Sequence, residues 1–223
     1  MSAKSIGLSD ELHAYLLRVG VREPEILGRL RAETQSMPAH NMQIAPEQGA
    51  FLALMVELTG ATRCIELGTF TGYSSLAVAL ALPADGTLLC CDVSEEWTAV
   101  ARRYWAEAGV ADRVELRLGP ALDTLDALLA GGAESTYDLA FVDADKVSYP
   151  AYYDRLIRLV RPGGLMLWDN VFRGGRVVDT NVDPDDVDLR GTQELNERLA
   201  GDERVSLAML PLADGVTMAR RRT

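Results

Sequence analysis

Short apolar runs alternate with stretches of helical length over most of this 223-residue chain. Five apolar runs predict strands, at residues 64–68, 87–92, 113–119, 138–143 and 164–170. Amphipathic stretches between them predict helices, at residues 73–82, 94–109 and 149–161. Strands that alternate with helices at this spacing indicate an α/β fold, with a mostly parallel sheet covered on both faces.

The two ends of the chain follow other patterns. The first 60 residues predict helices only, with Ser9 and Asp10 as a possible cap for the first, and Pro24 and Pro46 in the first turns of two more. Near the C-terminus, two apolar runs flank Ala213-Asp214-Gly215, which predicts an antiparallel hairpin.

One segment, residues 173–190, is rich in Asp and Gly and predicts a single long loop, of the kind that often forms a lid over a site. No linker or repeat divides the chain. We therefore expect one domain over residues 1–223, with helices in 1–60 and the α/β core in 61–223.

Composition and charge narrow the class of protein. A formal charge of −11 disfavours a nucleic-acid surface, which needs clustered Lys and Arg. No apolar stretch approaches the roughly 20 residues that span a bilayer, and the N-terminal residues lack the apolar core of a signal peptide. We expect a cytoplasmic protein whose partners include neither nucleic acid nor membrane.

The cysteines and histidines predict no site of their own. Cys64, Cys90 and Cys91 lie in strand-like runs, so we interpret them as core residues in a reducing cytoplasm, with the adjacent pair on opposite faces of a strand. His13 and His40 lie in the helical N-terminal part, which favours helix-face or solvated histidines over a metal or proton-relay site.

Acidic residues end four of the predicted strands, at Glu66, Asp92, Asp143 and Asp169. Ligands of open α/β sheets bind outside the carboxyl ends of the strands, so these acids are expected at the binding edge. One such acid often only caps the next helix or turn. Four carboxylates placed side by side, however, would be costly to bury without partners.

The first strand leads into a turn with Gly68 and Gly72, which permit a close approach of the backbone to a ligand. Their spacing differs from the GxGxxG pattern of dinucleotide sites, and Glu66 before the turn suits a ligand with a cationic amino group. Asp92 follows Gly68 by 24 residues, where an acid typically accepts hydrogen bonds from ribose. This pattern favours S-adenosylmethionine, with a nicotinamide cofactor as the main alternative.

Oxygen ligands follow two of the strands, at Asp143, Asp169 and Asn170. Such ligands suit Mg²⁺, Ca²⁺ or Mn²⁺ and would leave positions for water and substrate oxygens. Lys146 is expected at the start of a helix. It is either a solvated lysine paired with Asp145 or, beside a bound cation, a neutral amine that can act as a base.

Five segments together resemble the cation-dependent O-methyltransferases of the caffeoyl-CoA and catechol type, which include small bacterial members that modify catechol natural products. The segments are ELGTFTGYSSLAVALALP, CDVSEEW, FVDADKVSY, RPGGLMLWDNV and LPLADGVTMARR, and the resemblance runs from about Met42 to the C-terminus. It implies a Rossmann-like class I methyltransferase fold, S-adenosylmethionine and a divalent cation as cofactors, and a homodimer built through the N-terminal helices.

The resemblance also implies roles for individual residues. Lys146 would be the catalytic lysine, with Asp143 beside it, and Asp143, Asp169 and Asn170 would bind the metal. Glu66 and the turn after it would surround the methionine tail of the cofactor, Asp92 would hold the ribose and Ala121 would lie near the adenine. The full cofactor set is Met42, Ile44, Glu66, Gly68, Thr69, Phe70, Ser74, Asp92, Ala121, Asp143 and Asp145.

The implied reaction is methyl transfer to one hydroxyl of a small molecule with two vicinal aromatic hydroxyls, in secondary metabolism. Lys146 would take the proton of a hydroxyl acidified by the cation, and the oxygen would attack the methyl group in line. Many relatives carry Trp-Asn-Gly soon after the Asp-Asn pair, whereas this chain has Val171-Phe172-Arg173-Gly174-Gly175. Because that segment helps to shape the acceptor pocket in the relatives, the identity of their acceptors cannot be transferred to this chain. Arg173 or Arg176 either meets an acidic acceptor or is solvated.

Two alternatives remain open at this point. A nicotinamide-dependent oxidoreductase would use the same sheet edge, but the glycine spacing and the lack of a His-Tyr-type relay motif count against it. A non-catalytic S-adenosylmethionine-binding protein of the same fold would have lost its chemistry, whereas the ligands, the lysine and the turn are intact here.

Overall fold

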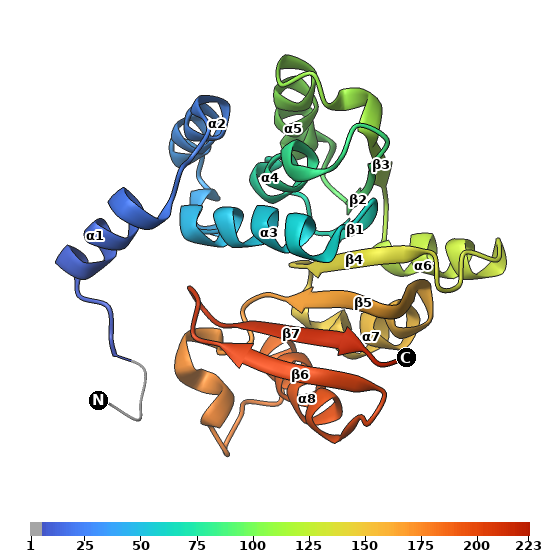
Figure 1. Cartoon of the computed structure of the whole chain (residues 1–223). Coiled ribbons are helices and arrows are strands. Elements are labelled where there is room, and N and C mark those ends of the chain that lie inside the picture. Colours follow the sequence, from blue (N-terminus) through green and yellow to red (C-terminus); the bar gives the residue numbers. More distant parts are fainter. Residues whose placement is uncertain (1–5) are drawn as a thin grey trace.

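A seven-stranded sheet forms the centre of the computed structural model, which describes residues 6–223 (Figure 1). The strand order is β3-β2-β1-β4-β5-β7-β6. The first five strands are parallel, and β7 pairs antiparallel with β5 and β6. The strands are β1 (Arg63–Leu67), β2 (Thr87–Asp92), β3 (Val114–Leu118), β4 (Tyr137–Val142), β5 (Val160–Trp168), β6 (Val205–Leu210) and β7 (Val216–Arg221).

Helices pack on both faces of this sheet (Figure 1). One face carries α3 (Pro46–Thr59), α4 (Tyr73–Ala81) and α5 (Glu95–Glu107), with α2 (Glu25–Gln35) packed on α4. The other face carries α6 (Ala121–Ala130), α7 (Tyr149–Leu159) and α8 (Val187–Gly201). Helix α1 (Asp10–Gly20) contacts α3, and the short 3₁₀ helices are η1 (His40–Met42), η2 (Ala111–Arg113), η3 (Lys146–Ser148) and η4 (Arg173–Val178).

Alternating side chains of the strands divide between two apolar cores. Cys64 and Cys90 face the core under α3, α4 and α5, whereas Ile65 and Cys91 face the core under α6, α7 and α8. All three cysteines are buried free thiols, as predicted, and Cys90 and Cys91 point to opposite faces. The parallel strands β1, β2 and β4 are buried on both faces, and these strands read as mostly apolar runs in the sequence. The edge strand β3 is only partly buried and carries Glu115 and Arg117.

The predicted α/β fold and C-terminal hairpin are confirmed, and so are the helix starts at Ser9, which caps α1, and Pro46 in α3. Pro24 lies at the N-cap of α2, one position before the first turn in which it was expected. The prediction of one loop over residues 173–190 is wrong, because η4 and the start of α8 lie within it. Helix α6 was not predicted.

The start of α8 lies within the Asp-rich run that suggested a loop. Asp186 is the N-cap of this helix, and its Oδ1 accepts a hydrogen bond from the Leu189 amide at 3.1 Å. Aspartate is favoured both in loops and at helix N-caps, so composition alone does not separate the two. Among the helices of residues 6–223, none is both long and apolar enough to cross a membrane.

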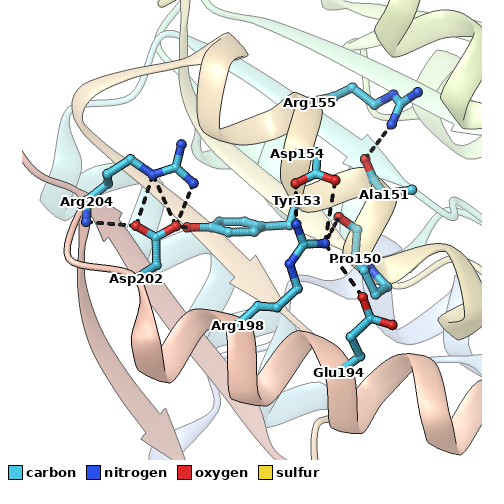
Figure 2. A network of polar contacts seen from close by, with 9 residues as sticks. All are labelled: Pro150, Ala151, Tyr153, Asp154, Arg155, Glu194, Arg198, Asp202 and Arg204. Carbon is cyan, nitrogen blue, oxygen red and sulfur yellow. Dashed lines mark hydrogen bonds and ion pairs between the residues drawn. The ribbon is translucent and has the colours of Figure 1, made fainter.

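Polar contacts fix α8 and the segment after it against α7 (Figure 2). Arg198 of α8 donates hydrogen bonds to Asp154 Oδ1 at 2.6 Å and to the Pro150 carbonyl at 3.2 Å. Directly after α8, Asp202 accepts hydrogen bonds from Tyr153 Oη at 2.7 Å and from the Arg204 side chain, with Nη2 at 2.6 Å. The Arg198 and Tyr153 contacts add to the apolar core that α7 and α8 share, and together they join the two helices.

The Asp202 contacts predict a pH-dependent stability. Arg204, by hydrogen bonding, holds the pKa of Asp202 well below its ordinary value. The ionised carboxylate therefore stabilises the folded chain above its unfolded-state pKa of about 4, and this contribution is lost as the pH falls further. We expect Asp202→Asn to lower Tm at pH 7 by about 2–4 °C, the shift for about 1 kcal/mol in a chain of this size.

Calorimetry at pH 7, 5 and 3 measures this difference, which should shrink toward pH 3. Glu203→Gln is the matched control, because Glu203 is the exposed neighbour of Asp202. An equal Tm deficit for Asp202→Asn at all three pH values would contradict the assigned role.

Candidate active site

A cavity of about 900 Å³ opens at the carboxyl ends of β1, β2, β4 and β5. The strand order reverses between β1 and β4, and such switch points are the usual ligand sites of open α/β sheets. The structure brings all predicted site residues except Glu66 to the wall of this cavity. They are Met42, Ile44, Gly68, Thr69, Phe70, Ser74, Asp92, Ala121, Asp143, Asp145, Lys146, Asp169 and Asn170.

The turn between β1 and α4 forms one wall. Gly68 has a φ of 86°, and a Cβ at this position would lie 2.5 Å from the carbonyl oxygen of Asp143, so only glycine fits. Asp92 Oδ2 accepts hydrogen bonds from the backbone amides of Thr69 at 2.9 Å and Phe70 at 2.8 Å. Asp92 therefore shapes the turn, and its carboxylate still has acceptor capacity for a ligand hydroxyl.

Glu66 lies behind this wall. Its side chain is buried, and burial raises its pKa well above the ordinary value. Its Oε2 atom has no hydrogen-bond partner within residues 6–223, although Ser74 and Thr69 lie near the carboxyl group. A buried carboxyl group with an unused oxygen suits a cationic or hydrogen-bond-donating ligand. Direct contact between Glu66 and a cofactor stays a prediction.

Lys146 begins η3 and points to the strand end beside it. Its Nζ lies 2.6 Å from Asp143 Oδ1, and the lysine side chain is buried. Asp145 instead accepts a hydrogen bond from the Tyr152 hydroxyl. The interpretation of Lys146 as a solvated lysine paired with Asp145 is therefore wrong, because the chain turns the lysine inward onto Asp143.

Asp169 and Asn170 follow β5 on the same side of the cavity. Asp169 is 2% exposed, and burial together with the charge of Asp143 raises its pKa to about 7. The backbone amide of Asn170, a residue with a φ of 53°, donates to Asp169 Oδ1 at 2.8 Å. Tyr149 Oη lies 3.0 Å from the Asp169 carbonyl oxygen, which fixes this strand end against α7.

These donors fit a divalent cation. Among the described residues, Lys146 is the only ammonium group close to the carboxylates of Asp143 and Asp169. The charge of Asp143 raises the pKa of Asp169 further than burial does alone. A cation would compensate this excess negative charge. No group of three or more His, Cys, Asp or Glu side chains that could hold a metal occurs in residues 6–223. The third ligand of the predicted set, Asn170, is an amide and is not of these residue types.

Several cavity residues carried no signal in the sequence. Gln48 of α3 is buried in the cavity wall, and its Nε2 has no hydrogen-bond partner in the described part of the chain. Trp97 of α5 lies edge-on to Phe70, with the ring centroids 5.1 Å apart. Tyr152 and Asp188 also line the cavity. Trp97 lies within the CDVSEEW segment and Gln48 within the stretch 42–49, both of which the resemblance uses, so these two could have been found.

Arg173 and Arg176, both in η4, differ in position. Arg173 lines the cavity, and its Nη2 lies 4.0 Å from Asp188 Oδ2. Arg176 pairs with Asp186 at 2.7 Å and is not among the lining residues. Only Arg173 is therefore placed to meet an acceptor. His13 lies 3.0 Å from Glu47 Oε1 and joins α1 to α3, and neither it nor His40 lines the cavity.

The sheet order and the acid-ended strands around one cavity define a Rossmann-like methyltransferase architecture, and comparison with solved structures agrees. The O-methyltransferase TomG from Streptomyces achromogenes, involved in tomaymycin synthesis and solved with S-adenosylmethionine, superimposes with a TM-score of 0.85 at 34% identity over 96% of each chain. An O-methyltransferase from Bacillus cereus, solved with S-adenosylhomocysteine, gives 0.85 at 32% identity over 95% of this chain and 97% of the other.

Sequence comparison gives the family. The model of the O-methyltransferase family matches residues 18–222. Caffeoyl-CoA O-methyltransferase 2 of Zea mays is 42% identical over 229 residues, which cover 98% of this chain and 85% of that protein. The chain belongs to the O-methyltransferase family and is an O-methyltransferase of the caffeoyl-CoA type. This finding counts against a nicotinamide-dependent oxidoreductase.

Proposed function

We propose that this enzyme transfers a methyl group from S-adenosylmethionine to one hydroxyl of a small molecule with two vicinal aromatic hydroxyls, with the aid of a divalent cation. The observation that carries the proposal is the meeting of Lys146, Asp143, Asp169 and Asn170 in one cavity beside the Gly68 turn. The solved relatives that contain S-adenosylmethionine or S-adenosylhomocysteine support the choice of methyl donor.

The donor side of the cavity is assigned to the turn and its neighbours. S-adenosylmethionine carries the transferred methyl group on a sulfonium sulfur. The backbone of Gly68 and Thr69, with Ser74 beside it, would face the methionine tail, and Met42 and Ile44 would close over it. The Asp92 carboxylate would accept hydrogen bonds from ribose hydroxyls, while Ala121 and Trp97 offer an apolar surface for the adenine ring.

The acceptor side is assigned to the ends of β4 and β5. Asp143, Asp169 and Asn170 would hold Mg²⁺, or else Ca²⁺ or Mn²⁺, because hard oxygen ligands select such ions. Held there, the cation would supply a fixed positive charge that orients both hydroxyls of the acceptor and acidifies the one to be methylated.

Lys146 is the proposed base. Its Nζ is held 2.6 Å from Asp143 Oδ1, at the edge of the cation ligands. A bound cation there would favour the neutral amine, and the lone pair of this amine would accept the proton of the acceptor hydroxyl. The acceptor oxygen then bonds to the methyl carbon as the bond between that carbon and sulfur breaks. Fixed placement of the reacting groups is the largest contribution, since positioning can supply roughly 7–11 kcal/mol.

We further propose that the chain forms a single domain, that the protein is cytoplasmic, and that it forms a homodimer through its N-terminal helices. None of the residues of α1 is buried in the described chain, and Leu8, Tyr15 and Val19 expose large apolar surfaces. A second copy would cover them. The role of TomG in tomaymycin synthesis supports an acceptor from secondary metabolism.

The test is methyl transfer from S-adenosylmethionine to caffeic acid or a dihydroxyphenylalanine, with Mg²⁺ and with excess chelator. We expect turnover with Mg²⁺ and a loss of at least about 10³-fold in chelator, because a metal Lewis acid supplies several kcal/mol. Equal turnover in both conditions would keep the transferase and remove the cation from the proposal. Cofactor binding without turnover across a panel of vicinal diols would favour a non-catalytic protein.

A further inference from the structure

We infer that helix α8 positions the proposed base: Asp188 and Gly191, in its first two turns, hold the η3 backbone that carries Lys146. The inference rests on the role proposed for Lys146. Neither residue belongs to the five segments that resemble other O-methyltransferases. Asp188 lies within the predicted loop of residues 173–190, and Gly191 directly follows it.

Gly191 allows the backbones of α8 and η3 to approach each other closely. A Cβ at this position would lie 2.3 Å from the Lys146 carbonyl oxygen and 2.8 Å from Val147 Cα. These are main-chain atoms, so no side-chain rotation could make room. Gly191 is buried and lies within the helix. A glycine in a helix interior lowers the stability of the helix relative to alanine. At position 191 the close approach of the η3 backbone explains why a glycine is present.

Asp188 adds a directional contact. Its Oδ1 accepts a hydrogen bond from the Val147 amide at 3.1 Å, and its Oδ2 faces Arg173. The Val147 amide belongs to the residue after Lys146, so this bond fixes the peptide plane next to the lysine Cα. Asp188 itself is held in the helix, where its carbonyl oxygen accepts from the Thr192 hydroxyl at 3.0 Å.

Helix α8 is a firm support because it is tied to α7, which follows η3 directly in the chain. Arg198 and the Asp202–Tyr153 contact make this tie, about two to three turns beyond Gly191 (Figure 2). Asp188 and Gly191 thus hold η3 from one end of α8, and the polar contacts hold α7 near the other end. The η3 segment that carries Lys146 therefore contacts α8 directly and continues into α7, which is itself joined to α8.

The first experiment compares two substitutions on the same helix. We expect Gly191→Ala to lower kcat by about 10²-fold, the cost of a misplacement of about 1 Å, while KM for S-adenosylmethionine changes less than twofold. Gly201→Ala is the matched control, because a Cβ there would meet no described atom within 4 Å. Equal kcat for both variants, with Gly191→Ala folded, would overturn the inference.

A second pair of variants avoids the steric clash, in case Gly191→Ala does not fold. Asp188→Ala removes the acceptor of the Val147 amide, whereas Asp188→Asn keeps an oxygen there. Hydrogen exchange of the Val147 amide should be at least about 10-fold faster in Asp188→Ala, the change for about 1.4 kcal/mol of lost protection, and restored in Asp188→Asn. Unchanged exchange in Asp188→Ala would overturn the inference.

A double-mutant cycle separates this inference from the proposed function. If α8 acts through the lysine, Asp188→Ala should lower single-turnover rates in the native background and have no further effect in a Lys146→Met background. Additive losses would show that α8 acts by another route and would refute the inference. Wild-type turnover in Lys146→Met alone would instead refute the proposed base, while the exchange result for Val147 would still stand.

Discussion

Replacing Lys146 by methionine is expected to lower kcat for methyl transfer by about 10²–10⁴-fold, the range that a positioned general base contributes. Methionine keeps an unbranched apolar stem in the buried space of the lysine, and it removes only the Nζ that lies 2.6 Å from Asp143. The Gly68 turn on the donor side does not depend on Nζ. Affinity for S-adenosylmethionine, measured by calorimetry, should therefore stay within about twofold of the native value.

Lys146→Arg is the decisive control for this prediction. Arginine keeps a positive charge that can pair with Asp143, but its guanidinium does not lose a proton in proteins. If Lys146 is the general base, Lys146→Arg should therefore be about as inactive as Lys146→Met. If arginine restores turnover, the lysine acts through its charge alone, and proton removal must be assigned to another group.

Asp169→Ala is expected to abolish cation-dependent turnover, with a loss of about 10³-fold or more, because it removes one of the two carboxylates assigned to the cation. Affinity for S-adenosylmethionine should remain, since the Asp92 and Gly68 contacts lie at other strand ends. Binding of Mn²⁺ to the variant, followed by electron paramagnetic resonance without acceptor or methyl donor, reads the cation site independently of activity.

Asp179→Ala is the matched control for this variant, because Asp179 is an exposed acid after η4 and does not line the cavity. It should bind Mn²⁺ as tightly as the native chain. Methylation that persists in Asp169→Ala, and in chelator, would remove Asp143, Asp169 and Asn170 from the proposed cation site.

The strand-end acids could be predicted from the sequence because a parallel sheet has a simple geometry. Once Asp92, Asp143 and Asp169 are each read as the end of a buried strand, all of them must lie at one edge. The Gly68 turn is equally local, since a glycine between a strand and a helix indicates an unusual backbone conformation there. These residues needed no knowledge of which helix packs where.

Other parts of the site depend on packing between distant segments. Gln48 reaches the cavity because α3 lies across the sheet, and Asp188 because α8 returns to η3. Neither placement follows from periodicity or spacing. The partner of Lys146 was also open in the sequence, since Asp143 and Asp145 are both near neighbours, and only the folded turn selects Asp143.

The contact between Gly68 and the Asp143 carbonyl has an evolutionary consequence. The space proposed for the methyl donor and the strand end proposed for the cation meet through main-chain atoms, without an intervening side chain. The distance between the methyl donor and the acceptor is thus set by the backbone of the fold and not by side chains. Side chains that line the cavity, such as Arg173 in the segment that departs from many relatives, can differ between relatives without changing that separation.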